Sequence, residues 1–222
     1  MVSPIKTRLA DLLEHDLFIP RELSWLSFNA RVLQEAADPT VPLIERLRYL
    51  GIFSNNSDEF FRVRVAEVRR LISVSSGAGK QEAKDLLAAI QKRVVELQKE
   101  FDRIYVNLMS ELAARKIYLV NERQLDAGQG AFVQAFFTDK VLPELEPILL
   151  RDGQAIPPLN DESLYLAMDI LSGKTYYYAV VEVPTDRLPR FIEIPRRKSK
   201  GGKVFIALDN IIRACLPQIF RG

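Results

Sequence analysis

A search of the sequence for complete catalytic sets finds none. The chain holds one histidine, His15, and one cysteine, Cys215, so a histidine-rich metal cluster or a two-histidine mechanism is excluded within it. The GAGK segment at 77–80 lacks the opening strand and the spacing of a phosphate-binding loop. Cys215 lies in an apolar helical pattern, which is typical of a buried structural thiol. His15 lies in a charged segment and is interpreted as an exposed or loosely packed residue.

Two polar features could still bind a ligand, and the first is a basic run near the C-terminal end. It comprises Arg196, Arg197, Lys198, Lys200 and Lys203, with Gly201 and Gly202 among them. Such a concentration of positive charge could attract a polyanion. The pattern is also typical of a solvated hairpin loop, which is the favoured interpretation.

The second feature is the segment from Ser54 to Arg70. It places the Asn55 and Asn56 amides at a predicted helix N-terminus and follows them with several arginines. Helix N-termini present free N–H groups and a positive dipole end, which suit a phosphate or the polar edge of a base. The alternative, favoured on physical grounds alone, is that Asn56 only caps the helix while the arginines pair with Glu59 and Glu67. The arginines are Arg62, Arg64, Arg69 and Arg70.

The composition is that of an ordinary globular protein. The 222 residues include 31 Lys and Arg against 29 Asp and Glu, with 48% apolar residues. This near-neutral balance argues against a dedicated nucleic-acid binder. No stretch approaches about 18 consecutive apolar residues, so no transmembrane segment is predicted. Charges among the first fifteen residues argue against a signal peptide, and the lone cysteine favours a reducing compartment. We therefore expect a cytoplasmic protein.

Up to about residue 117 the patterning is helical. One helix is predicted over 24–37, with Ser24 as its N-cap, and a second from Pro42 to Phe53. The polar trio at 54–56 has poor helix propensity, so we expect a sharp break or kink there and a new helix N-terminus after it. Residues 73–80 are predicted to form a loop.

A long fourth helix is predicted over about 81–116. Its apolar residues alternate in steps of three and four, which is a heptad pattern that must pack on other helices. We therefore expect the N-terminal half to be an all-α helical bundle with one long helix. The residues of the pattern are Leu87, Ile90, Val94, Leu97, Phe101, Ile104 and Leu108.

Beyond residue 117 the pattern changes to strands and turns. A short strand at 117–120 and a helix at 129–141 are expected first. Strand-like runs at 164–171 and 175–183 flank Ser172-Gly173-Lys174 and predict a hairpin. Further strands are predicted at 191–194 and 204–207, and Asp209 is expected to cap a last helix. The predicted fold class is α+β, with the bundle followed by a partial α+β domain that has a mainly antiparallel sheet.

Several segments resemble the N-terminal part of bacterial polyphosphate kinase, the ATP-dependent, histidine-phosphorylated type. The main match is RELSWLSFNARVLQEAADPTVPLIERLRYLGIFSNNSDEFFRVRVAEVRR at 21–70. Within it, ELSWLSFN together with FSNN.DEF is highly specific. Further matches are VNERQL at 120–125, VPTDRLPRFIEIP at 183–195 and LDNIIRACLPQIF at 208–220.

The resemblance implies a reaction and a domain order. Members of the family reversibly transfer the terminal phosphate of ATP to inorganic polyphosphate through a phosphohistidine. In the family that histidine and the Mg²⁺-associated residues lie in two C-terminal domains, which would follow this chain. The resemblance thus implies a flexible tail at 1–12, the helical N domain at 13–117 and a partial head domain at 118–222. A chain truncated at Gly222 in this way is expected to be inactive by itself.

One site residue carries over from the resemblance. The second asparagine of the family's SNN motif contacts ATP, and here it is Asn56. An amide suits this role because it offers an acceptor and a donor to an adenine edge. The next residue is usually leucine in the family, whereas this chain has Ser57, which is expected to loosen local packing or to lengthen the cap.

The resemblance also implies partners. They are ATP and ADP, inorganic polyphosphate, and further copies of the chain in a homodimer or higher homo-oligomer formed through the head domain. Mg²⁺ is expected in the full-length enzyme, with no metal ligands in this chain. The alternative hypothesis is a non-enzymatic interaction module whose long helix binds a partner helix and whose basic run binds a polyanion.

Overall fold

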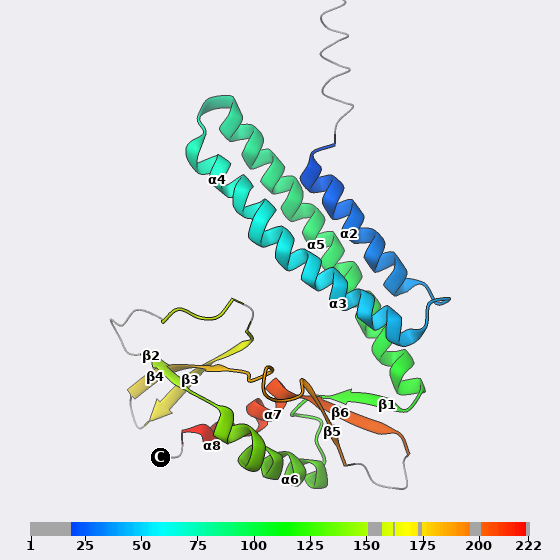
Figure 1. Cartoon of the computed structure of the whole chain (residues 1–222), viewed down its shortest axis with the longest axis vertical. Coiled ribbons are helices and arrows are strands. Elements are labelled where there is room, and N and C mark those ends of the chain that lie inside the picture. Colours follow the sequence, from blue (N-terminus) through cyan, green and yellow to red (C-terminus); the bar gives the residue numbers. More distant parts are fainter. Residues whose placement is uncertain (1–18, 151–156, 162, 173–174, 196–200, 221–222) are drawn as a thin grey trace, which may run out of the picture. The chain divides into compact units, whose positions relative to one another are not determined.

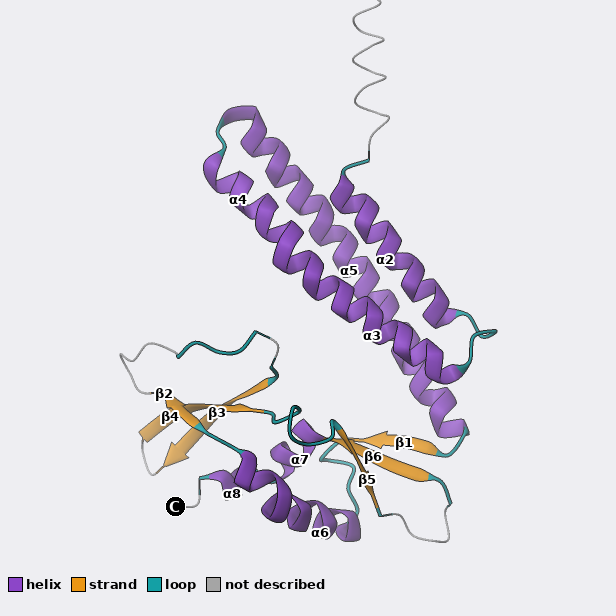
Figure 2. Cartoon of the chain, viewed as in Figure 1, coloured by secondary structure: helices purple, strands orange, loops and turns teal. Residues whose placement is uncertain are grey.

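The protein is built from two compact units. The computed structural model describes residues 19–150, 157–161, 163–172, 175–195 and 201–220. The described residues up to Glu111 form one unit and those from Leu112 onward form the other (Figure 1). The first unit is helical and the second combines helices with two small sheets (Figure 2), so the predicted α+β class is confirmed.

The helical unit is built from long helical segments, each of which runs antiparallel to the one before it in the chain (Figure 1). Helix α2 spans Arg21–Ala37, and α3 spans Leu43–Phe60. The π-helical turn η1 and helix α4 continue α3 without a break, over Phe61–Val65 and Ala66–Val74. The chain then turns back into α5, Gly77–Ala114, which has 38 residues. This arrangement confirms the predicted bundle with one long helix.

Most of the heptad pattern of α5 is buried within this unit, as predicted, while Leu87, Val94 and Phe101 are half-buried. Ile90 and Leu108 are fully buried, and Phe101 contacts Phe53 of α3 with ring centroids 5.7 Å apart. The predicted loop at 73–80 is wrong, because only Ser75 and Ser76 separate α4 from α5. Gly77 allows this short turn with a φ of 57°, a conformation that glycine adopts without a Cβ clash.

Two predicted helix starts are also wrong. Helix α2 begins at Arg21 after Pro20, three residues before Ser24. Proline suits this boundary because its fixed φ and missing N–H cost nothing before the first turn. In the second unit, α7 begins at Leu208, so Asp209 lies inside the first turn and is not the cap. The Asp209 carboxylate instead lies 3.2 Å from Arg190 and 3.3 Å from Arg213.

The predicted break at residues 54–56 is wrong, because all three residues lie inside α3. The Ser54 hydroxyl donates to the carbonyl of Leu50 at 3.2 Å, one turn earlier. The Asn56 amide donates to Asn29 of α2 at 3.0 Å. Tertiary hydrogen bonds and packing therefore override the weak local helix propensity of the trio.

The continuous helical run of α3, η1 and α4 departs from regular α-helical geometry at η1, which begins five residues after Asn56. Phe60 is buried, and with ordinary helical spacing the next residues on the core face would be Arg64 and Glu67. The wider π-helical turn adds one residue, so that Val65 and Val68 are buried instead. The π turn thus moves two apolar side chains into the core and leaves the charged ones outside it.

The second unit contains two three-stranded sheets. The first has the order β1-β6-β5, in which β1 is parallel to β6 and β5 is antiparallel to it. The second has the order β2-β4-β3 and is antiparallel throughout, which confirms the predicted hairpin and the mainly antiparallel character. Gly173 and Lys174 of the hairpin turn lie outside the described residues. The strands are β1 Ile117–Val120, β2 Ile148–Leu150, β3 Tyr165–Ser172, β4 Thr175–Glu182, β5 Phe191–Ile194 and β6 Lys203–Ala207.

Short helices cover these sheets and complete one apolar core. Helix α6 has a capping box, in which the Asp126 carboxylate accepts from the Gln129 N–H and the Gln129 side chain accepts from the Asp126 N–H. Val133, Phe137 and Ile206 are almost completely buried in this core. The helical elements are α6 Ala127–Phe136, the π turn η2 Phe137–Val141, the 3₁₀ turn η3 Leu142–Glu144, α7 Leu208–Ala214 and α8 Leu216–Ile219.

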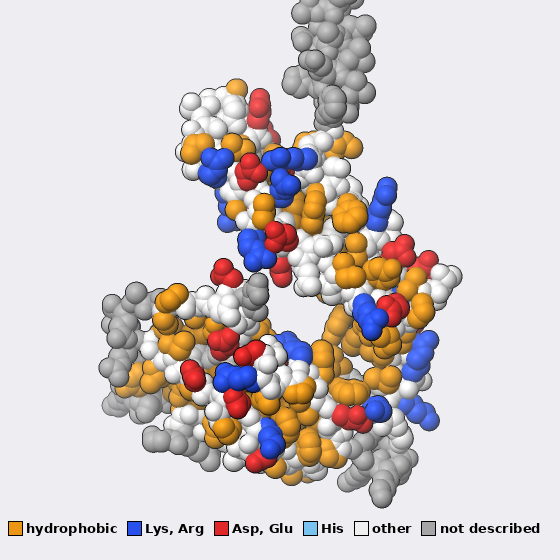
Figure 3. Space-filling view, in the orientation of Figure 1, with side chains coloured by type: hydrophobic (Ala, Val, Ile, Leu, Met, Phe, Trp, Pro, Cys, Tyr) orange, Lys and Arg blue, Asp and Glu red, His pale blue; other side chains and the backbone are white. Residues whose placement is uncertain are grey.

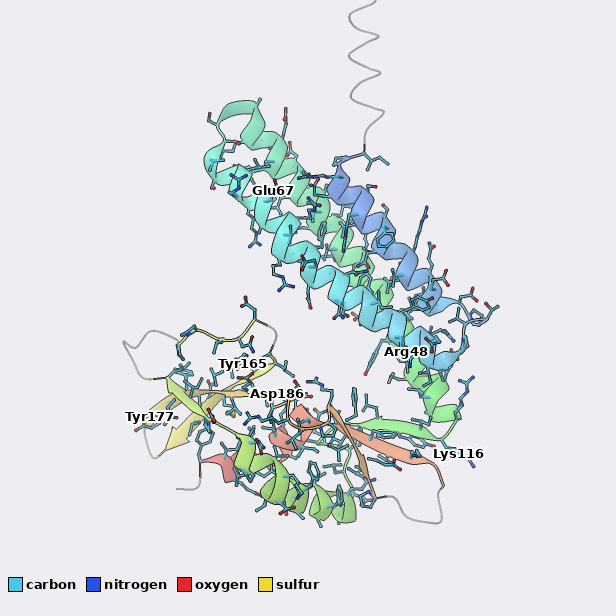
Figure 4. All side chains as sticks on the ribbon, in the orientation of Figure 1. Arg48, Glu67, Lys116, Tyr165, Tyr177 and Asp186 are labelled. Carbon is cyan, nitrogen blue, oxygen red and sulfur yellow. The ribbon has the colours of Figure 1, made fainter. Side chains whose placement is uncertain are left out.

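Lys116 marks the turn between the last residues of α5 and strand β1 (Figure 4). Its φ of 64° lies in the left-handed region, which ends a helix. Its N–H donates to the Ala113 carbonyl at 2.9 Å, and its own carbonyl accepts from the Lys203 N–H at 2.8 Å. The same residue therefore closes α5 and starts the pairing of β1 with β6.

Arg46 connects three helices of the first unit. Its side chain is 7% exposed, and its Nε donates to the Ala36 carbonyl at 2.9 Å while Nη2 reaches the Ala37 carbonyl. Its Nη1 donates to both carboxylate oxygens of Glu111 on α5, at 2.9 and 3.0 Å. The guanidinium thus satisfies carbonyls at the end of α2 that lack helical partners.

We expect Arg46→Ala to lower the free energy of unfolding of the helical unit by about 2–4 kcal/mol, because buried carbonyls lose their donors. Urea unfolding followed by far-UV circular dichroism measures this loss. Arg48→Ala is the matched control, because Arg48 is 69% exposed and pairs only with Glu45 one turn away (Figure 4). The control should change stability by less than about 0.5 kcal/mol. Equal losses of unfolding free energy for the two variants would contradict the role of Arg46 as a donor to the carbonyls at the end of α2.

Candidate functional site

The candidate site residue Asn56 lies on the flank of α3 in the helical unit. It is half-buried, its neighbour Asn55 is exposed, and Phe53 and Phe60 on the core face are buried. A side chain at this position can keep one polar edge in the bundle while it offers the other to a ligand. Because α3 is continuous here, the site consists of side-chain amide groups rather than of the free N–H groups of a helix N-terminus.

A hydrogen-bond network links Asn56 to α2. The Asn56 Nδ2 donates to the Asn29 Oδ1 at 3.0 Å. The Asn29 Nδ2 donates to the Phe53 carbonyl and to the Ser57 Oγ, both at 3.2 Å. The Ser57 hydroxyl in turn donates to the same Phe53 carbonyl at 2.8 Å. Asn29 is 0% exposed, so the network fixes a fully buried amide at both ends.

Ser57 therefore does not lengthen a helix cap, since it lies within α3. Its hydroxyl fills the space beside Asn29 with a second acceptor, in addition to the backbone carbonyl of Phe53. The Trp25 ring, four residues before Asn29, stacks on Phe60, four residues after Asn56, with centroids 4.7 Å apart and an interplanar angle of 18°. The same two helices are thus joined by the polar network and by an aromatic contact about one turn away.

Two ion pairs involve the charged residues that follow Asn56. Arg62 pairs with Glu59 at 2.9 Å, as the simpler interpretation predicted. Glu67 pairs with Arg21 of α2 at 3.1 Å rather than with an arginine of its own helix (Figure 4). On the visible face of the helical unit, positive and negative side chains are interspersed (Figure 3). On this face the described positive side chains are therefore not gathered into a one-sign patch.

The other sequence candidates do not join this site within the described residues. His15 and the basic residues 196–200 lie outside the described ranges, and only Lys203 of the run is described, paired with Glu193 at 3.1 Å. In the described parts, no three His, Cys, Asp or Glu side chains gather as metal ligands would. The described helices include none that is long and apolar enough to cross a bilayer.

Cys215 is buried in the core of the second unit, as predicted for a structural thiol. It is 1% exposed. Burial raises the pKa of the thiol because the low-polarity surroundings disfavour the thiolate. A raised pKa and lack of access are the opposite of what a nucleophilic cysteine requires.

Reasoning from the sequence missed Asn29 of the site, and it also missed Arg46, which connects helices elsewhere in the same unit. Both occupy core-facing positions of an apolar pattern, since Asn29 lies between Leu26 and Leu33 and Arg46 between Leu43 and Leu50. A polar residue on an apolar face must find buried partners, and this was the available signal.

Comparison with protein families identifies two consecutive matches along the chain. Residues 18–120 match the polyphosphate kinase N-terminal domain, and residues 128–222 match the polyphosphate kinase middle domain. The chain is 52% identical over 208 residues to a polyphosphate kinase of Vibrio cholerae, which covers 93% of this chain and 30% of that protein. It is 46% identical over 211 residues to a polyphosphate kinase of Escherichia coli, which covers 94% and 31%.

A solved structure shows the same fold. The crystal structure of polyphosphate kinase from Porphyromonas gingivalis superposes with a TM-score of 0.74 and 33% sequence identity. The match covers 90% of this chain and 31% of that chain. The present chain thus spans about a third of the length of the relatives that it matches.

We expect thiol reagents to modify Cys215 in the folded chain more than about tenfold more slowly than in urea, because burial removes both access and thiolate. Absorbance or mass spectrometry follows the labelling. The raised pKa contributes stability that is fully present below the pKa of the unfolded thiol and is lost as the pH rises through the folded value. Rapid labelling of the folded chain would contradict the burial of this residue.

Proposed function

This chain belongs to the polyphosphate kinase family, and we propose that within a full-length enzyme it covers the base of ATP, while its phosphates react on domains outside this chain. The whole reaction is the reversible transfer of the terminal phosphate of ATP to inorganic polyphosphate through a phosphohistidine. Because the chain spans 30% of its relatives, this activity is proposed for the full-length protein only.

The hydrogen bonding and the partial burial of the Asn56 amide are the main support for this proposal. Asn56 is half-buried and anchored to Asn29 through its Nδ2, and its Oδ1 has no hydrogen-bond partner among the described residues. Asn56 also lies in the segment that matches the family's N-terminal domain. A partly sheltered amide with a free acceptor suits the polar edge of a purine, because a hydrogen bond gains strength where water is partly excluded.

The remaining parts of the proposal follow the family. Mg²⁺ acts in the full-length enzyme with ligands that we do not assign to this chain, and the α+β unit contributes to self-association. We propose a cytoplasmic location for this enzyme. The alternative of an interaction module that uses the long helix is not favoured, because the apolar pattern of α5 is buried within its own unit.

We expect Asn56→Ala, in a full-length polyphosphate kinase that carries this chain, to raise the KM for ATP by the equivalent of about 1–2 kcal/mol through lost contacts to the base. Steady-state kinetics at saturating polyphosphate measure this change. Asn55→Ala is the matched control, since Asn55 is exposed on the same turn. An unchanged KM for ATP in a correctly folded Asn56→Ala enzyme would remove Asn56 from the site.

We also expect the 222-residue chain alone to form no polyphosphate from ATP, because no phosphorylatable histidine is assigned to a site within it. Incubation with ATP and magnesium, followed by electrophoresis of polyphosphate, tests this expectation. The full-length enzyme is the positive control. Polyphosphate synthesis by the isolated chain would show that the chemistry is wrongly placed.

A further inference from the structure

The orientation of the Asn29 amide is determined by its surroundings. Its Nδ2 lies 3.2 Å from the Phe53 backbone carbonyl, which can only accept a hydrogen bond. A flipped amide would set two acceptor oxygens against each other in a fully buried position, which is strongly unfavourable. The Asn29 Oδ1 must therefore face the opposite side, toward Asn56.

The orientation of the Asn29 amide fixes that of the Asn56 amide in turn. An acceptor at the Asn29 Oδ1 requires a donor, so Asn56 must present its Nδ2 inward, at 3.0 Å. The Asn56 Oδ1 then faces away from the network. Among the described residues this oxygen has no hydrogen-bond partner, and it is not one of the buried, unsatisfied side-chain atoms, so it is open to solvent. The open edge of the site thus presents an acceptor at a fixed place.

We infer that Asn29 is a positioning residue, which holds the Asn56 carbonyl oxygen toward the ligand and so favours a purine with a 6-amino group over one with a 6-oxo group. This inference rests on the proposed role of Asn56 at the base of ATP. An exocyclic amino group donates to the fixed Oδ1, whereas the O6 of guanine is an acceptor that meets another acceptor. The discrimination originates at the Phe53 carbonyl and reaches the ligand through two amide groups.

Ser57 adds to this device in the present chain. Its Oγ is a second acceptor for the Asn29 Nδ2 at 3.2 Å, and its own proton is used by the Phe53 carbonyl. With its proton committed in this way, the hydroxyl can only accept from Asn29. Two acceptors therefore hold the Asn29 amide in one orientation.

The test compares ATP with GTP in a full-length polyphosphate kinase that carries this chain. We expect Asn29→Ala to lower kcat/KM for ATP roughly five- to tenfold and to lower the ratio of kcat/KM for ATP to that for GTP by a similar factor. The released Asn56 amide can then rotate and donate to O6. If the substitution only loosened the structure, kcat/KM for ATP and kcat/KM for GTP would fall by the same factor and their ratio would not change.

Conservative variants keep the test decisive. Asn29→Asp should retain the ratio, because burial favours the neutral carboxylic acid, which donates to Phe53 and accepts from Asn56 as the amide does. Should Asn29→Ala fail to fold by circular dichroism, Asn29→Ser replaces it, since its hydroxyl can bond within its own helix but is too short to reach Asn56. Asn55→Ala is again the matched control, with an unchanged ratio expected.

The outcomes separate this inference from the proposed function. One outcome is that Asn56→Ala raises the KM for ATP, while folded Asn29→Ala or Asn29→Ser keeps the ratio of kcat/KM for ATP to that for GTP. This outcome overturns the positioning role of Asn29 and retains the proposed role of Asn56. If Asn56→Ala leaves the KM for ATP unchanged, the proposed function itself fails. A fall in the ratio with Asn29→Ala, together with its retention in Asn29→Asp, supports the positioning role.

Discussion

The buried amide of Asn29 constrains how α2 and α3 meet. Because Asn29 is completely buried, its donor and its acceptor both need partners, and α3 supplies them from Phe53, Asn56 and Ser57. A shift of α2 along α3 by one residue would leave these groups unpaired. The apolar contacts on either side, such as the stacking of Trp25 on Phe60, are less directional and follow the register that the amide imposes.

The continuity of α3 changes the chemistry of the site. A helix that started after residue 56 would expose backbone N–H groups and a positive dipole end, which suit a phosphate. In the continuous helix those N–H groups bond to carbonyls one turn earlier, and only neutral side-chain amide groups remain. Neutral amide groups suit the role proposed for this site, which is to contact the uncharged end of a nucleotide rather than its phosphates.

Strong local periodicity made the larger elements predictable, and interactions between distant residues explain the failures. The heptad pattern of α5 and the hairpin of β3 and β4 are each contained in one short stretch of sequence. The sequence around Ser54–Asn56 has no comparable local signal, and in the structure Asn56 bonds to Asn29, more than twenty residues away. Strand β2 has three residues, too few for a periodic signal. Asn56 could be proposed only through a family resemblance, because its isolated pattern also fits a simple helix cap.

Placing the amide on a rigid helix has a thermodynamic consequence for the proposed site. A side chain on a loop would lose rotamer freedom when a ligand binds, whereas the Asn56 amide is already held by Asn29. The ordering cost is met during folding, where the buried network also stabilises the packing of two helices. Such an arrangement contributes to the choice of the base and adds no charge near the phosphates. Selection of the nucleotide and transfer of its phosphate can then be carried by separate parts of the polypeptide, each with the electrostatic surroundings that its task requires.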